Sequence, residues 1–109
     1  MAIQNLTFKM PIDDVFELNE FIAGIFITGH IEFGIIRPNS SVMIVDAVGN
    51  TQISCIVSGI VSQSSIPTFE KKMLEFASEY QDDHLGIALI FNDKRVLDCA
   101  QPGMFVVMA

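Results

Sequence analysis

Residues 24–33 read GIFITGHIEF, and this stretch decides the class of fold because its side chains alternate with a period of two. Successive side chains of an extended strand point to opposite faces. One face of the predicted strand carries Ile25, Ile27, Gly29, Ile31 and Phe33, and the other carries Phe26, Thr28, His30 and Glu32. The pattern predicts a single strand over residues 24–33, and Gly29 within it indicates a bend or a close backbone approach.

The sequence on the C-terminal side of this stretch continues the β pattern. Gly34 is expected to end the strand, residues 37–40 favour a turn, and Gly49 and Asn50 favour a tight reversal. Further strands are predicted at residues 42–45, 51–61, 85–91 and 104–108. The strand at 51–61 is expected to place Ile53, Cys55, Val57 and Val61 on one face. The nearly continuous apolar run at 85–91 predicts a strand buried on both faces.

One segment departs from the period of two. Its apolar residues, spaced near 3.6, are Phe69, Met73, Phe76 and Tyr80. This spacing predicts a short amphipathic helix at residues 68–80, with Thr68 as its cap, although a strand stays possible for so short a pattern. The apolar stripe either plugs one end of the fold or forms a partner-binding or dimerising surface. We take it as the candidate partner-binding site.

Five or six strands, one inserted helix and no alternation of strands with helices predict an all-β domain. The expected architecture is a closed or nearly closed antiparallel β-barrel that occupies residues 1–109 as a single domain. Closure of the sheet also removes the exposed edges that would invite aggregation.

The composition bears on the partners. The 109 residues carry a formal net charge of −7, and only 17% are charged while 50% are hydrophobic. A polyanion such as RNA is repelled by this overall field, so RNA is disfavoured as a partner but not excluded. The shortage of charged residues suggests that some apolar surface meets another copy of the chain or another protein.

The sequence also bears on the compartment. Residues 1–5 show no basic region followed by an apolar stretch, so we expect no secretory signal. No apolar run approaches the length of about 18 residues that spans a membrane. Cys55 and Cys99 have no metal-binding or redox spacing and are expected to be reduced packing residues. We therefore expect a cytoplasmic protein with no membrane contact.

Four segments in order along the chain resemble the second, β-barrel domain of elongation factor Tu-type translation GTPases. Residues 8–16 (FKMPIDDVF) are similar to the family's domain-opening motif, and residues 28–36 (TGHIEFGII) to its Thr-Gly-Arg-Val-Glu-Arg-Gly-Ile-Ile segment. Residues 83–89 and 96–106 are similar to the run before the fifth strand and to the closing pattern. The resemblance implies a six-stranded Greek-key barrel that stands here without a GTPase domain.

The departures from the family pattern limit what the resemblance implies about ligands. No Gly-x-x-x-x-Gly-Lys-Ser/Thr phosphate loop is present, so no nucleotide binding is expected. In the family this barrel helps to hold the aminoacylated end of transfer RNA. Asp13, Asp14, Phe16 and Thr28 match positions near that pocket. However, the loop between Phe16 and Thr28 is two residues longer than in the family, His84 replaces the family's Asn, and residues 62–79 have no clear counterpart. The aminoacyl pocket is therefore not assigned here.

The remaining polar residues give no catalytic, cofactor or metal site. Asp13 and Asp14 are adjacent in a strand, so their side chains should point apart. His30 has only Glu32 beside it on its face, which is too few ligands for zinc, and a surface or hydrogen-bonded histidine is expected. His84 and its neighbouring aspartates fit a solvated turn. Lys94-Arg95 with Arg37 gives the one hint of a phosphate contact, and the serines lack a nucleophile motif.

The sequence as a whole predicts a non-enzymatic binding or assembly module of translation-factor barrel type, acting through self-association or a protein partner. The alternative is a translation-related domain that contacts RNA, such as aminoacyl-tRNA or the ribosome, or a GTPase.

Overall fold

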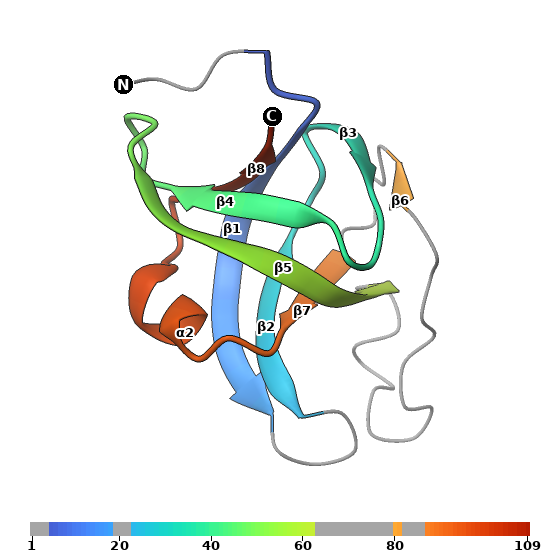
Figure 1. Ribbon diagram of the computed structural model, residues 1–109, viewed down its shortest axis with the longest axis vertical. Coiled ribbons are helices and arrows are strands. Elements are labelled where there is room, and N and C mark those ends of the chain that lie inside the picture. The colour runs from blue at the N-terminus through green and yellow to red at the C-terminus, as the bar shows by residue number, and fades with distance from the viewer. Residues whose placement is uncertain (1–4, 19–22, 63–79, 82–86) are drawn as a thin grey trace.

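The computed structural model describes residues 5–18, 23–62, 80–81 and 87–109, and this part of the chain is built almost entirely of β-strands (Figure 1). In chain order the elements are β1 (Phe8–Leu18), β2 (Gly24–Gly29), β3 (Phe33–Ile36), β4 (Ser41–Val45), β5 (Thr51–Ser62), β6 (Tyr80–Gln81), β7 (Ile87–Phe91), α2 (Arg95–Cys99) and β8 (Phe105–Met108).

Six of these strands close into a ring. Neighbouring strands pair in the order β2-β7-β5-β4-β8-β1, and a further pairing of β1 with β2 completes the circuit. Every pairing in the ring is antiparallel. β3 and β6 lie outside the ring, with β3 attached to β1 and β6 attached to β3. The predicted closed, antiparallel, all-β architecture is confirmed, while its Greek-key connectivity stays a prediction.

The interior of the ring is a continuous apolar core. Its fully buried side chains include Phe8, Met10, Ile25, Ile27, Ile44, Ile60, Leu89, Phe91 and Val106. These residues come from all six ring strands, so the core itself holds the ring closed through the burial of apolar surface. In the described part of the chain, no helix has the length and apolar character needed to span a bilayer.

The strand predicted at residues 24–33 is in fact two strands. β2 ends at Gly29 and β3 begins at Phe33, whose side chain is 41% exposed rather than directed into the core. Gly29 lies so close to β1 that an added Cβ would collide with the carbonyl oxygen of Pro11, so the predicted close backbone approach is confirmed. The chain leaves the strand at this corner, although Ile31 is still buried in the core between the exposed His30 and Glu32, as the alternation predicted. Gly34, expected to end the strand, lies inside β3 at a φ of 95°.

A β-bulge overturns one detail of the predicted face of β5. The pairing with β7 shifts register between Val57 and Gly59, which leaves Ser58 as the extra residue. The extra residue changes the phase of the alternation, so Ile60 points into the core and Val61 points to the outside of the ring. The prediction that Val61 shares a face with Val57 was therefore wrong, while Ile53 and Val57 do point inward.

A second apolar cluster lies on the outer side of the ring over β2, β5 and β7. It consists of Phe26, Val61, Ala88 and Ile90, with Phe16 and Leu18 packed against it. All five residues of β7 are buried, three in the interior core and two in this outer cluster. The expectation of a strand buried on both faces is confirmed for residues 87–91.

The helix predicted at residues 68–80 lies almost entirely outside the described residues. Residues 68–79 lie outside the described residues, and Tyr80, the last residue of the predicted helix, is in β6, where it pairs with Ile36. The described helix is α2, which the sequence did not predict. It follows Asp93, whose carboxylate accepts a hydrogen bond from the Arg95 backbone N–H at 2.9 Å. α2 packs against β5 and β1 and buries Val96 in the core.

Candidate functional site

The stripe proposed from the sequence as a partner-binding surface falls mostly outside the described residues. Phe69, Met73 and Phe76 lie there, and Tyr80 is described only through its backbone pairing in β6. The stripe therefore stays a prediction.

The acidic residues of β1 do not converge on one point. The Asp13 carboxylate lies 3.1 Å from Nδ1 of His30, while the Asp14 carboxylate accepts the backbone N–H of Val15 at 2.9 Å. His30 is thus the hydrogen-bonded surface histidine that the sequence predicted, with 55% of its side chain exposed. Among the described residues, no group of three or more His, Cys, Asp and Glu side chains could hold a metal ion.

Lys94 and Arg95, two of the basic residues that suggested a phosphate contact, lie beside acidic side chains. The Lys94 ammonium lies 3.6 Å from a Glu17 carboxylate oxygen, and the Arg95 guanidinium is bound by Asp93. Near the other end of β1, the Lys9 ammonium lies 3.3 Å from Glu32 and 4.5 Å from the centre of the Phe105 ring. These cations are therefore partly neutralised, which weakens the case for a phosphate-binding patch.

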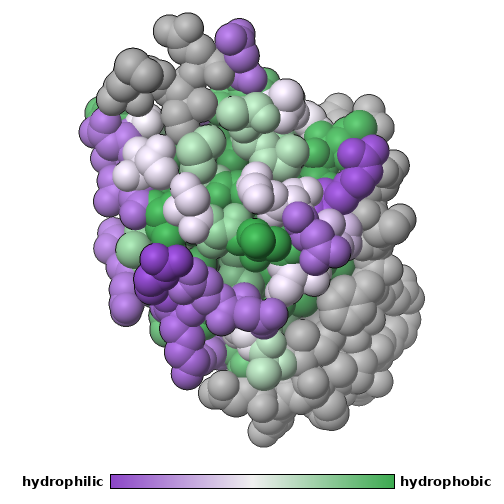
Figure 2. All heavy atoms as spheres, in the orientation of Figure 1, coloured by the Kyte–Doolittle hydropathy of each residue, from purple (hydrophilic) through white to green (hydrophobic). Residues whose placement is uncertain are grey.

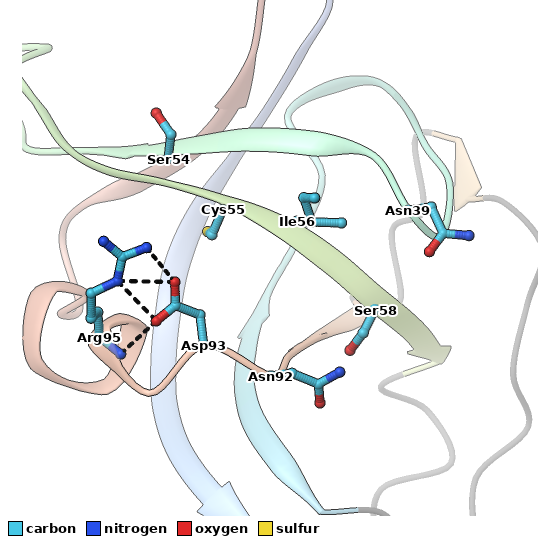
Figure 3. Close-up of a pocket in the computed structure, with 8 residues that line it drawn as sticks. All are labelled: Asn39, Ser54, Cys55, Ile56, Ser58, Asn92, Asp93 and Arg95. Atoms are coloured by element: carbon cyan, nitrogen blue, oxygen red, sulfur yellow. Dashed lines mark hydrogen bonds and ion pairs between the residues drawn. The ribbon is translucent and has the colours of Figure 1, made fainter.

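One concave feature of the described surface is an open groove of about 440 Å³ beside β5 (Figure 3). Its lining comes from β5, from the turn before β4 and from the connection between β7 and α2: Asn39, Ser54, Cys55, Ile56, Ser58, Asn92, Asp93 and Arg95. We call this feature the β5 groove. Apart from the Asp93–Arg95 pair, its polar groups are uncharged amides and hydroxyls, together with the Cys55 thiol.

Ile56 is the apolar feature of the β5 groove. Its side chain is 58% exposed, whereas the other isoleucines of the same strand, Ile53 and Ile60, are buried. Figure 2 shows this face of the molecule, where apolar surface across the middle is bordered by hydrophilic residues. Single exposed apolar side chains are common on protein surfaces, so the feature that marks Ile56 is its place inside a concave surface lined by polar residues.

The groove exists because two neighbouring strands separate. β5 pairs with β4 along one edge at residues 51–56, and with β7 along its other edge only at residues 57–62. β7 ends at Phe91, and the chain then leaves β5 to form the turn that begins α2 (Figure 1). The Ser58 hydroxyl donates a hydrogen bond to the Ile90 carbonyl oxygen at 2.9 Å and so fixes the bulge at the point of separation.

The wall of the groove opposite β5 is held rigid by an ion pair. Nε of Arg95 lies 3.1 Å from both Asp93 carboxylate oxygens, and Nη2 lies 2.6 Å from one of them (Figure 3). The hydrogen bonds from Arg95 lower the pKa of the Asp93 carboxyl, and the same bonds raise the pKa of Arg95. Such a two-pronged pair fixes the arginine geometry and leaves this wall nearly neutral.

Cys55 lines the groove but is a poor nucleophile. Its side chain is only 8% exposed, and burial, reinforced by the Asp93 charge, raises the pKa of the thiol to about 11. The thiolate is the reactive form of cysteine, so little of it exists near neutral pH. Cys55 and Cys99 are both free thiols, as the sequence predicted.

Sequence reasoning missed this site. Its members are spread over three segments, and only the tertiary structure brings Asn39 and Asn92 to the same groove as Ile56. One local signal was available: Ile56 interrupts a run of outward-facing hydroxyl residues, Ser54 and Ser58, in an otherwise regular alternation. A lone apolar residue on the polar face of a strand is the pattern that could have indicated it.

A scan of protein-family models and a search of curated proteins each find no match to this chain. The resemblance to the translation-factor barrel therefore stays a prediction from the sequence.

Proposed function

We propose that this protein is a non-enzymatic binding module that acts through protein–protein contacts, and that the β5 groove is its docking site. The observation that carries the proposal is the exposed Ile56 in a groove of about 440 Å³ rimmed by amide and hydroxyl groups. Amides and hydroxyls both donate and accept hydrogen bonds, which suits them to the peptide groups of a partner. An apolar anchor within a polar rim is the usual arrangement of a protein interface.

The chemistry of the groove supports binding over catalysis. The Ser58 hydroxyl donates its hydrogen to the Ile90 carbonyl oxygen, which is not a base that could activate it as a nucleophile. Burial keeps the Cys55 thiol protonated. The acid in the groove, Asp93, is engaged by Arg95 and is stabilised in its charged form, which makes it a weak general base.

The charge of the chain also supports a protein partner over a nucleic acid. The net charge is −7, and of the cations named above, Lys9, Lys94 and Arg95 each lie against a carboxylate. A nucleic-acid interface gains affinity by releasing counterions from phosphates, and this requires unopposed positive charge.

A matched pair of charge substitutions tests the proposal. Ile56→Glu places a carboxylate in the β5 groove, whereas Val48→Glu places one at the tip of the β4–β5 connection, where Val48 is 74% exposed. Both changes add the same charge to an exposed position, so both variants should fold. Immobilised wild-type and variant proteins would be used to capture partners from native extract, with protein and RNA identified separately, and the solution mass of each variant would be measured.

We expect Ile56→Glu to lose the captured protein, or the self-association, that wild type and Val48→Glu retain. Equal capture by all three proteins would show that the β5 groove is not the docking site. Capture of RNA that disappears at higher salt, with no protein partner, would overturn the proposal in favour of RNA binding.

A further inference from the structure

β5 has an unpaired edge at the β5 groove. On one side, residues 51–56 pair with β4, and on the other side β7 pairs only from Val57 onward. Among the described strands, none pairs with residues 51–56 on the β7 side. An unpaired strand edge carries a row of backbone N–H and C=O groups that a further strand can complete.

The hydrogen bonds of Val57 show which backbone groups face the groove. Its N–H donates to the Ser40 carbonyl oxygen at 3.0 Å, and its C=O accepts the Asn39 N–H at 2.7 Å, so both groups point to the β4 side. Backbone groups of successive strand residues point to opposite edges. Ser54 and Ile56 therefore direct their N–H and C=O groups to the side on which β7 departs.

The space beside this edge is bounded by the connection from β7 to α2. Asn92, Asp93 and Arg95 line the groove together with Ser54, Cys55 and Ile56 of β5, and its volume is about 440 Å³. An added strand needs a spacing of about 4.8 Å from its neighbour, and three or four residues extend over about 10–13 Å. A short extended segment is therefore the shape that completes such an edge.

The net charge of the chain favours a segment that carries basic residues. The Asp93–Arg95 pair leaves the far wall nearly neutral, so the field of the whole chain, with its net charge of −7, governs the approach of a partner. A segment with basic residues is attracted by this field, and an acidic one is repelled. Next to Ile56, an apolar side chain of the segment would complete a cross-strand pair.

We propose that the β5 groove takes an extended segment of a partner protein as an added strand on β5, with an apolar residue beside Ile56 and basic residues in its flanks. The inference rests on the proposed function, because it specifies how the partner binds at the same groove. It goes beyond that function because the backbone N–H and C=O groups of Ser54, in addition to side chains of the groove, contribute to the affinity for the partner.

Ser54→Pro tests the backbone contact, with Ser54→Ala as its matched control. Proline removes the N–H that faces the groove but leaves the N–H groups that face β4 in place, and edge positions of this kind tolerate proline. Ser54→Ala removes the hydroxyl and keeps the N–H. Circular dichroism and urea unfolding of both variants would establish that they are folded.

The probe is a fluorescein-labelled seven-residue peptide of alternating threonine and valine with a lysine at each end, acetylated and amidated. Its affinity would be measured by fluorescence anisotropy. We expect Ser54→Ala to change Kd by less than about twofold, and Ser54→Pro to weaken binding by about tenfold, which corresponds to about 1.4 kcal/mol. The counterpart peptide with glutamate ends should bind more weakly at low salt, and the difference should shrink as salt screens the charges.

A second measurement requires no change in the protein. N-methylation of every second peptide bond of the lysine-ended probe removes the N–H groups along one edge of the peptide. Two such peptides can be made, each methylated along a different edge, and one of them should bind about tenfold more weakly than the other. Strand addition would be overturned if Ser54→Pro and Ser54→Ala bound the probe with equal affinity, or if the wild type bound the two methylated peptides with equal affinity. If Ile56→Glu nevertheless loses its partner, the docking site stands and only the mode of binding fails.

Discussion

The bulge at Ser58 makes a sharp prediction about two isoleucines of the same strand. Ile56 and Ile60 are four residues apart, so a regular strand would place both on one face. In this structure Ile56 is 58% exposed and Ile60 is fully buried, because the extra residue between them shifts the phase. Replacing each with alanine makes the same chemical change and the same change in strand propensity. Any difference in stability therefore reports the difference in burial.

The expected magnitudes follow from the burial. Removing a fully buried isoleucine side chain to alanine costs about 2–5 kcal/mol through lost transfer energy and the cavity left behind. At Ile56 more than half of the side chain is already in water, so Ile56→Ala should cost about 1 kcal/mol or less. Because the chain has no tryptophan, urea unfolding would be followed by far-UV circular dichroism. Equal losses of unfolding free energy at the two positions would refute the bulge and the phase change derived from it.

Three further predictions concern the corner, the thiol and the β4–β5 connection. Gly29→Ala, whose Cβ would meet the Pro11 carbonyl, should lower the unfolding free energy by about 3 kcal/mol. Gly103→Ala has open space around its added Cβ, and only the positive φ of 92° disfavours it, so it should lower the unfolding free energy by about 1 kcal/mol. A larger loss for Gly103→Ala than for Gly29→Ala in urea titrations would contradict the close approach of Gly29 to β1. Burial raises the pKa of Cys55 to about 11, above the ordinary value of 9.0, so its contribution to stability is complete below pH 9 and is lost as pH rises towards 11. Mass spectrometry should accordingly show slow alkylation of Cys55 by iodoacetamide at pH 8 in the folded protein and fast alkylation in urea. Backbone N–H groups of residues 48–50 lower the pKa of the Asp46 carboxyl, so its contribution to stability is present above pH 3.8 and is lost as pH falls further. Asp46→Ala should therefore reduce the fall of the unfolding free energy at acid pH. An unchanged fall would contradict this role of Asp46.

The parts of the fold that local chemistry dictates could be predicted from the sequence. The period of two identified the strands, and the glycine at position 29 marked the corner where β1 and β2 approach. The run that ends at Phe91 was recognised as a strand with two buried faces because its residues are apolar without alternation. Each of these features is encoded by residues that are neighbours in the chain.

The features that the sequence did not reveal depend on contacts between distant segments. A bulge is defined by the strand opposite, so nothing in residues 51–62 alone shows that Ser58 is extra. α2 is a single turn stabilised by Asp93 and by burial of Val96, and five residues are too few for a helical period to be recognised. The groove depends on both features, which explains why its residues were not predicted as a site.

Ser58 is the extra residue of the bulge, and its deletion tests whether the bulge, in addition to the end of β7 at Phe91, is needed to open the groove. Without Ser58, Val57 still points inward, Gly59 outward and Ile60 inward, so the core should keep the same side chains. Regular pairing with β7 would then replace the bulge, and the extra twist that bulges give to a strand would be lost. We expect the deletion variant to unfold cooperatively but to bind the lysine-ended peptide at least tenfold more weakly than wild type. Unchanged peptide affinity in a folded deletion variant would show that the bulge is not what opens the groove, and the proposed edge of β5 would then have to arise from the departure of β7 alone.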